Sequence, residues 1–452
     1  MNPPFWDTGI PSSWRLLGVG LAYVLVAFWI KYVVARLPLG AARVISSLPV
    51  FAVSIVCPWV FDARTEVLQR LSAVFIYSWL CNFKVLAFCW GRPPLRESMT
   101  VVQIAAVTML PIFLRPPESI ASGPKGRLQD SAGSAVALAL RWLAKIVLLG
   151  SIAFLVIGYG DSMPGAVRHY VYSFGLYAFV GFLMDGPAAL AVEALGLQVI
   201  PTFDQPWMSS CLADFWGRRW NIPTTSVLRT VVYDTIVDGC LVIPARRLAA
   251  APATAAAELK NLPRSAQNGG DHQTHLAPAS PPEHQQMQRS PRTPAEQELA
   301  ARSHPQPKQQ QQPMQQGARR PSMLRRQLGL HATFLVSGLV HDYIAWLVRL
   351  DGVWGWKWTV FFYMQAPLMS LEALGNRLLR RAGVQLPRPL TILLTLAALE
   401  VMAYDLFFGF VERDTDLAHR VVTAVTSSYA GLLAPLQPLV AGLVAAASEV
   451  RQ

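Results

Sequence analysis

Residues 328–350, LGLHATFLVSGLVHDYIAWLVRL, constrain the fold more than any other stretch, because a membrane-length apolar run has an ionisable group near its middle. About 20 predominantly apolar residues suffice for a helix to cross a bilayer. In a helix centred on Leu339, His341 lies roughly 3 Å from the bilayer midplane, since each residue rises about 1.5 Å. A charged side chain at that depth costs at least ~2.5 kcal/mol. We therefore expect a functional role for His341, with a packing histidine that hydrogen-bonds a neighbouring helix as the alternative.

Two neighbours of His341 refine this expectation. The small residues Ser337 and Gly338 precede it by one helical turn and leave room beside the imidazole. Asp342 follows it directly and points about 100° away around a helix, so we do not expect it to orient the imidazole.

The composition of the chain is that of a polytopic membrane protein. Of its 452 residues, 53% are hydrophobic and 15% are charged, which is too apolar for a soluble globular protein. The net charge of +12 resides mostly in loops and in one polar insert. Membrane topology explains basic loops, so we expect contact with lipid and no nucleic-acid partner. The five cysteines show no CxxC or CxxH spacing, and hence predict neither a disulfide framework nor a metal site.

Hydropathy predicts an all-α fold of about eight to ten transmembrane helices. The apolar stretches are 14–34, 44–61, 71–90, 101–114, 135–157, 169–197, 227–243, 328–350, 353–374, 389–410 and 422–447. The first has no cleavage site before it and is expected to be a retained signal anchor. Within 169–197, Asp185-Gly186-Pro187 is expected to break the helix. Lys84 in the third stretch is expected to snorkel or to face a cavity.

Four regions follow from this pattern. Residues 1–197 hold N-terminal transmembrane helices, and 198–245 hold a polar segment and the helix after it. Residues 246–327 are rich in Pro, Gln and Arg without hydrophobic periodicity, and so predict a disordered insert. Residues 328–452 hold the C-terminal transmembrane helices and His341.

The polar segment 200–221, IPTFDQPWMSSCLADFWGRRWN, carries too many charges to span a membrane. If Ser209 or Ser210 caps a helix, Asp214 and Arg218 lie at i, i+4 and can pair. Trp216 and Trp220 then share another face. This pattern is typical of an amphipathic interfacial helix.

The octapeptide Asp214–Asn221, DFWGRRWN, followed later by SGLVHDYIAWL, resembles the wax synthase-like family of long-chain-alcohol O-fatty-acyltransferases, which is related in pattern to the membrane-bound O-acyltransferases. The resemblance covers residues 200–240 and 328–410. It implies an integral membrane enzyme of the endoplasmic reticulum that forms esters from acyl-CoA and a lipophilic alcohol, without a cofactor. The alcohol is a fatty alcohol, or a terpenoid or sterol hydroxyl with acetyl-CoA as donor.

The chemistry of ester formation suits these residues. A buried neutral imidazole is a general base for an alcohol, so His341 is the expected catalytic base. Asn221 can donate its amide N–H to the oxyanion. Arg218 and Arg219 can bind the phosphates of CoA, in a substrate-binding segment that also holds Asp214, Trp216 and Trp220.

Two other classes remain open from the residues. A transporter or channel would use intramembrane ionisable groups as an ion or proton path, namely Asp234, Asp238, His341, Glu400 and Asp405. A non-catalytic membrane scaffold would keep the fold without the activity.

Overall fold

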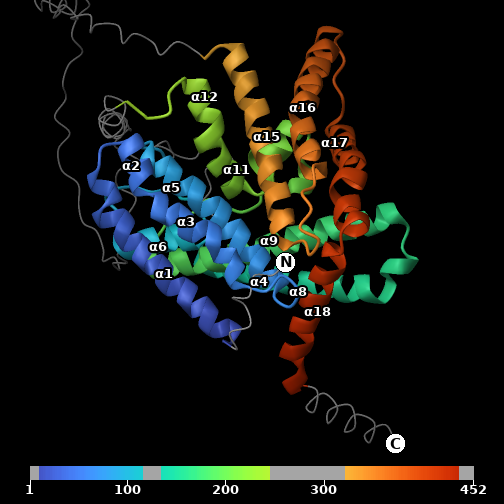
Figure 1. Cartoon of the computed structure of the whole chain (residues 1–452). Coiled ribbons are helices and arrows are strands. Elements are labelled where there is room, and N and C mark those ends of the chain that lie inside the picture. Colours follow the sequence, from blue (N-terminus) through green and yellow to red (C-terminus); the bar gives the residue numbers. More distant parts are fainter. Residues whose placement is uncertain (1–9, 116–133, 245–320, 437–452) are drawn as a thin grey trace, which may run out of the picture.

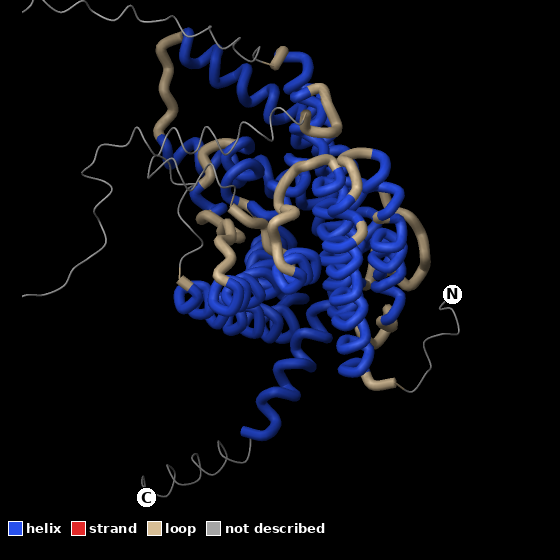
Figure 2. Tube along the Cα trace, turned by 90° about the vertical axis from the view of Figure 1, so that its left-hand side faces the viewer, coloured by secondary structure: helices blue, strands red, loops and turns tan. Residues whose placement is uncertain are grey.

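The computed structural model describes residues 10–115, 134–244 and 321–436. These residues form helices and connecting loops without a β-strand, as Figure 2 shows. A single isolated bridge pairs Leu114 with Val199. The expected all-α fold is therefore confirmed. The predicted disordered insert, residues 246–327, lies outside the described residues as far as residue 320. Its last residues are described, and a helix begins within them, at Met323.

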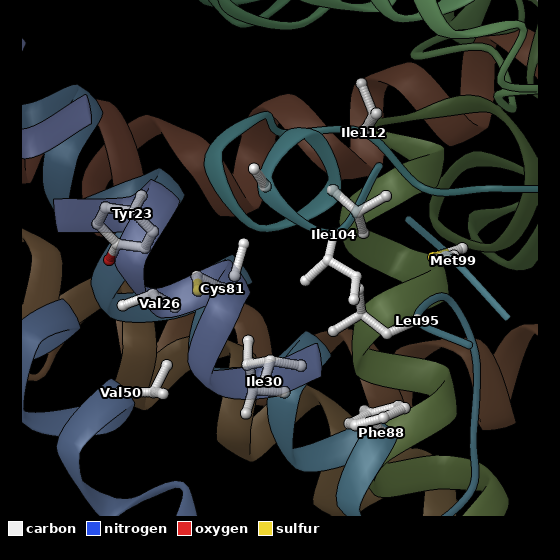
Figure 3. Packing of buried hydrophobic residues seen from close by; sticks show 14 of the residues in the cluster. Tyr23, Val26, Ile30, Val50, Cys81, Phe88, Leu95, Met99, Ile104 and Ile112 are labelled. Atoms are coloured by element: carbon white, nitrogen blue, oxygen red, sulfur yellow. The ribbon is translucent and has the colours of Figure 1, made fainter. Parts of the chain in front are cut away.

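An N-terminal bundle encloses the largest apolar core. Helices α1 (Ser12–Tyr32) and α6 (Val101–Met109) pack together, and α3 (Leu48–Val56) lies beside the segment that precedes α5 (Asn82–Cys89). Figure 3 shows the side chains that meet between them, Tyr23, Val26, Ile30, Val50, Cys81, Phe88, Leu95, Met99, Ile104 and Ile112. The short α6 begins with a full capping box, because Thr100 and Gln103 satisfy each other's backbone N–H groups.

One long helical unit carries a buried lysine through this bundle. It runs from α4 (Val67–Ala73) through the π-helical segment η4 (Val74–Cys81) into α5. Lys84 is 1% exposed, so it does not snorkel. Its ammonium donates to the carbonyl oxygens of Val107 and Leu110, each at 2.8 Å. Lys84 thus satisfies carbonyl groups that the C-terminal end of α6 leaves without helical partners.

Helices α8 (Ala135–Tyr159) and α9 (Gly165–Leu195) form an antiparallel pair that a buried ion pair joins. Lys145 binds Asp185, and Gly181 opposite provides the space for the lysine side chain. The expected break at Asp185-Gly186-Pro187 was wrong, because α9 continues through Pro187 to Leu195. The tertiary ion pair fixes the position of Asp185 within α9, and helix–helix packing of this kind can offset the backbone hydrogen bond that Pro187 cannot make.

The C-terminal helices stand beside this pair. Figure 1 shows α15 (Met323–Val348) running alongside α16 (Lys357–Arg381), which a short loop joins to α17 (Arg388–Ala403). The π-helical segment η10 (Tyr404–Asp414) extends α17, and α18 (Leu417–Leu433) packs on α8. The hydroxyl of Ser322 caps α15 by accepting the backbone N–H of Arg325 at 3.3 Å.

Five helical stretches of the described residues are long and apolar enough to cross a membrane: Ser12–Arg36, Val67–Cys89, Ala135–Ser162, Gly165–Leu195 and Arg388–Asp414. They carry many exposed large apolar side chains, which a bilayer would cover. The chain is accordingly an integral membrane protein. Helices α15 and α16 reach a similar length, 26 and 25 residues, but carry more polar residues.

The Lys145–Asp185 pair predicts a large asymmetry between single and double substitution. Asp185→Ala leaves the lysine charged and buried without its partner, and should destabilise the protein by about 3–5 kcal/mol. The double variant Lys145→Met with Asp185→Leu removes both charges and should lose much less. Thermal unfolding of purified protein in one detergent measures both. Equal losses in the two variants would contradict the ion-pair assignment.

Candidate active site

The ring of His341 has a fixed orientation and tautomer. Its Nδ1 lies 2.7 Å from the carbonyl oxygen of Ser337, one helical turn earlier in α15. A carbonyl oxygen only accepts hydrogen bonds, so Nδ1 carries a proton and donates it. In the neutral imidazole the lone pair then lies on Nε2. The histidine therefore presents Nε2 as a base.

Three aromatic side chains surround the imidazole. Phe362 of α16 stacks on it with ring centroids 3.9 Å apart. Trp79 of η4 and Trp358 of α16 meet its edges at 5.2 and 6.0 Å. Sequence reasoning missed these residues because they belong to other helices, and nothing in residues 328–350 indicates which helices pack against them.

A hydrogen-bonded contact locks α15 to α16 beside His341. Asp342 is fully buried and accepts the backbone N–H of Thr359 at 2.8 Å and its hydroxyl at 2.5 Å. A Cβ at Gly338 would lie 2.6 Å from the Cα of Thr359, so this glycine permits the close approach. Asp342 also supplies an acceptor and a negative charge at the N-terminal turn of α16. It accepts hydrogen bonds from Thr359 and not from the imidazole, so it does not orient the ring, as expected.

The DFWGRRWN segment is not a regular amphipathic helix. It comprises one turn, α10 (Leu212–Asp214), and the π-helical η7 (Phe215–Arg219), after which Trp220 is extended. The expected serine cap was wrong: Cys211 is the cap residue, and its sulfur accepts the N–H of Asp214 at 3.3 Å. The expectation that Trp216 and Trp220 share a helical face fails for the same reason.

Asp214 organises the segment. Its carboxylate binds Nε of Arg219 at 2.7 Å and Nη2 of Arg218 at 2.8 Å, which confirms the expected i, i+4 pair. Burial alone would raise the pKa of Asp214, but hydrogen bonds from Arg219 and from the N–H of Ser210 hold it below its ordinary value. The Arg219 guanidinium also donates to the carbonyl oxygen of Asp204 at 2.9 Å. Arg219 is thus an internal brace, whereas the side chain of Arg218 is 56% exposed.

Two side chains of α16 attach this segment to the helix bundle. Glu372 accepts the backbone N–H of Leu212 at 2.9 Å. Gln365, which is fully buried, accepts the indole N–H of Trp216 at 3.1 Å. The ring of Trp216 also meets that of Phe362, which stacks on His341. Helix α16 therefore positions both halves of the site.

Asn221 occupies a strained backbone position at the end of the segment. Its φ of 41° is left-handed, a conformation that asparagine tolerates better than most residues. There it precedes α11 (Ile222–Leu228), and its carbonyl oxygen accepts the N–H of Thr225 at 3.1 Å. Its side-chain Oδ1 is buried without a hydrogen-bond partner in the described part of the chain. Backbone strain and a buried amide oxygen without a partner together are typical of functional sites.

His341 and Asn221 meet at two cavities. The apolar cavity, about 260 Å³, also includes Trp220 and lies among η4, α8, α9, α15 and α18. The other cavity, about 300 Å³, is called the polar cavity because Thr224 and Arg229 lie in its otherwise mostly apolar lining. It also includes Trp216 and is lined by residues of α11, η8 (Arg229–Tyr233), α15 and α16. Both cavities contain Trp79 as well. Asp214, Arg218 and Arg219 line neither cavity, so they lie outside the space that His341 and Asn221 share.

The sequence of the chain is similar to those of several plant O-acyltransferases. The chain is 29% identical over 226 residues to acyl-CoA–sterol O-acyltransferase 1 of Arabidopsis thaliana and 26% identical over 225 residues to a long-chain-alcohol O-fatty-acyltransferase of Simmondsia chinensis. These matches cover 49% and 48% of this chain, and 61% and 60% of the relatives. The chain is similar to the wax synthase-like acyltransferases. A probable long-chain-alcohol O-fatty-acyltransferase 8 of Arabidopsis thaliana matches over 90% of this chain and 92% of its own length at 24% identity. The resemblance that the DFWGRRWN motif indicated is thus confirmed, while no protein-family profile matches the chain.

The lowered pKa of Asp214 predicts a pH-dependent contribution to stability. A carboxyl whose pKa falls on folding stabilises the protein above its unfolded pKa, about 3.9, and this contribution is lost as the pH falls through the folded value. Asp214→Asn should lower stability by about 1–3 kcal/mol at pH 7, and the difference from wild type should shrink below about pH 4. Thermal unfolding across this range measures the effect.

Asp405→Asn is the matched control, because Asp405 forms an exposed ion pair with Arg413. Exposed pairs contribute about 0–1 kcal/mol, so this variant should differ little from wild type at any pH. If stability depends on pH in the same way in the two variants, the hydrogen bonds of Asp214 do not stabilise the segment as we propose.

Proposed function

We propose that this chain is a membrane O-acyltransferase that transfers an acyl group from acyl-CoA to a lipophilic alcohol, with His341 as general base. The observation that carries the proposal is the shared position of His341 and Asn221 at two cavities. His341 offers a free basic nitrogen, and the amide Nδ2–H of Asn221 is a donor for the oxyanion; acyl transfer requires one group of each kind.

The base acts on the hydroxyl of the acceptor. As this oxygen attacks the thioester carbonyl, Nε2 of His341 takes its proton, and a tetrahedral intermediate forms. The hydrogen bond from Nδ1–H to Ser337 stabilises the imidazolium, because it places a carbonyl dipole against the positive ring. The surrounding aromatic rings of Phe362, Trp79 and Trp358 limit the access of water, which would otherwise compete as acceptor.

Asn221 stabilises the intermediate. Its amide N–H donates to the oxygen that becomes negative in the transition state, and the fixed left-handed backbone pre-organises this donor. When the intermediate collapses, the C–S bond breaks and the CoA thiolate leaves. The imidazolium of His341 then returns its proton to the sulfur, which restores the enzyme.

The two cavities separate the two substrates. The apolar cavity suits a hydrocarbon chain, and the polar cavity, with Thr224 and Arg229, suits the pantetheine arm of CoA. The exposed Arg218 and Arg229 are available for the CoA phosphates. Arg219 acts on CoA indirectly, through the brace that it forms with Asp214.

The acceptor is a long-chain alcohol or a sterol, the two classes that the names of the relatives cover. Lipophilic acceptors of both classes reach the site from the bilayer. We extend the proposal to the endoplasmic reticulum membrane, on the resemblance to the wax synthase-like family. Membranes that contain the full chain, incubated with radiolabelled palmitoyl-CoA and a panel of fatty alcohols and sterols, test the activity. Absence of ester with every acceptor overturns the proposal.

His341→Ala should lower ester formation by about 10²–10⁴-fold, the usual effect of losing a general base. Protein level and monodispersity in detergent should stay near wild type. His331→Ala is the matched control, because His331 lies in the same helix and lines neither cavity. An activity within a few-fold of wild type in His341→Ala would remove this histidine from the base role.

Substitutions in the DFWGRRWN segment should separate by kinetic parameter. Asn221→Gly keeps the left-handed backbone and removes the amide, so kcat should fall by about 10²-fold or more. Arg218→Ala should raise KM for acyl-CoA with a smaller change in kcat, because phosphate contacts contribute mainly uniform binding. Arg219→Ala should instead reduce the yield of folded protein. Titration of acyl-CoA on monodisperse variants tests all three, and unchanged constants for Asn221→Gly and Arg218→Ala would place the segment outside the active site.

A further inference from the structure

A third cavity lies between α9 and α17, and we call it the lateral cavity. It has a volume of about 220 Å³, and its mostly apolar and aromatic lining includes Tyr170, Phe174, Trp207, Trp220, Phe362 and Glu400. Tyr170, Phe174 and Trp207 on its rim are between 42% and 48% exposed. Because α9 and α17 both belong to membrane-length stretches, this rim faces lipid.

One acidic group lies in this apolar lining. Among the lining residues only Glu400 is a carboxylate. Its Oε1 is buried and lacks a hydrogen-bond partner in the described part of the chain, and so does Nδ1 of His169. The two atoms are 4.0 Å apart, too far for a direct hydrogen bond. His169 is 1% exposed and is not among the residues that line the cavity, so a ligand oxygen reaches it only beside Glu400.

The groups around this pair are already paired. Nε2 of His169 lies 3.0 Å from Glu412, which also binds Arg168. The charges of Arg168 and Glu412 cancel. With one further proton on either His169 or Glu400, the whole cluster is neutral, so an uncharged ligand fits it better than a fatty acid anion or an amine.

Hydrogen-bond chemistry narrows the ligand further. An oxygen about 2.8 Å from both atoms can bridge a 4.0 Å gap. Whichever of His169 and Glu400 holds the proton, one of the two facing atoms donates and the other accepts. A hydroxyl, which does both, satisfies the pair. An ether or ester oxygen only accepts, and would leave one atom unsatisfied.

We propose that the lateral cavity is a docking site for a long-chain alcohol, whose hydroxyl bridges His169 and Glu400 while its chain lies against the aromatic lining. This inference rests on the proposed function, for which it names the route of the acceptor. The site discriminates the free alcohol from its ester, because esterification removes the hydroxyl proton.

The aromatic lining connects this site to the reaction centre. Phe362 lines both the lateral and the polar cavity and stacks on His341. Trp220 lines both the lateral and the apolar cavity and precedes Asn221 in the chain. A shift of these two rings brings an alcohol held in the lateral cavity to Nε2 of His341.

The test measures binding of tritiated 1-hexadecanol to full-length, detergent-solubilised protein. All variants carry His341→Ala, so that no turnover occurs. Glu400→Leu should weaken binding about 10-fold or more, the effect of losing a hydrogen bond to a charged or strongly polar group. Glu400→Gln keeps a donor and an acceptor and should bind within a few-fold of the parent. Unlabelled hexadecyl methyl ether should compete at least 10-fold less well than unlabelled hexadecanol.

Equal hexadecanol binding in the Glu400→Leu variant and its parent would overturn the proposal. Equal competition by the ether and the alcohol would also overturn it, since water alone would then satisfy the polar pair. Size-exclusion profiles show whether each variant is folded. If the Glu400→Leu variant does not fold, competition by the ether in the parent and in the Glu400→Gln variant still tests the proposal. If hexadecanol binds as expected but the wild-type protein has no acyltransferase activity, the proposed function alone is refuted. If the wild-type protein has acyltransferase activity but hexadecanol does not bind as expected, the docking site alone is refuted.

Discussion

The contact between Asp342 and Thr359 determines the geometry of the whole site. It fixes the N-terminal turn of α16 against α15 one residue beyond His341, and Gly338 makes the approach possible. Every other feature of the site depends on α16 in this position. Its aromatic residues enclose the imidazole, while Gln365 and Glu372 hold the DFWGRRWN segment in place. A buried carboxylate beside the expected base is therefore structural, and its hydrogen bonds from α16 offset part of the cost of burying it.

Local sequence rules anticipated the features that depend on one helix alone. The separation of Asp342 from the imidazole and the pairing of Asp214 with Arg218 both follow from helical periodicity. The same rules failed where tertiary partners override periodicity. Asn221 is left-handed because the chain turns there from extended Trp220 into α11, and α9 stays helical through Pro187. No pattern within one segment predicts which helices enclose His341, because that depends on contacts between distant residues.

Two kinds of buried polar group occur in the described part of the chain. Lys84 and the Lys145–Asp185 pair are fully engaged with carbonyl oxygens or with each other, and they join helices. Asn221 and the facing atoms of His169 and Glu400 are buried without hydrogen-bond partners in the described residues. Leaving such a group unsatisfied costs about 1–3 kcal/mol. A ligand that hydrogen-bonds to such a group recovers this energy, and Asn221 and Glu400 are unsatisfied groups that also line cavities.

The same distinction bears on an ion path through the membrane. Three of the acids that such a path would use are in ion pairs with nearby arginines, at 3.4 Å for Asp234 and 3.1 Å for Asp238, and between Asp405 and Arg413. A conducting carboxylate must exchange partners, and a paired one holds its counter-ion. His341 has its Nδ1 committed to Ser337 and aromatic rings around it, so it has one free nitrogen rather than the two that a proton relay passes between. A base with one free nitrogen, at a cavity that it shares with the amide of Asn221, suits a general base with an oxyanion donor, and this favours acyl transfer over ion conduction.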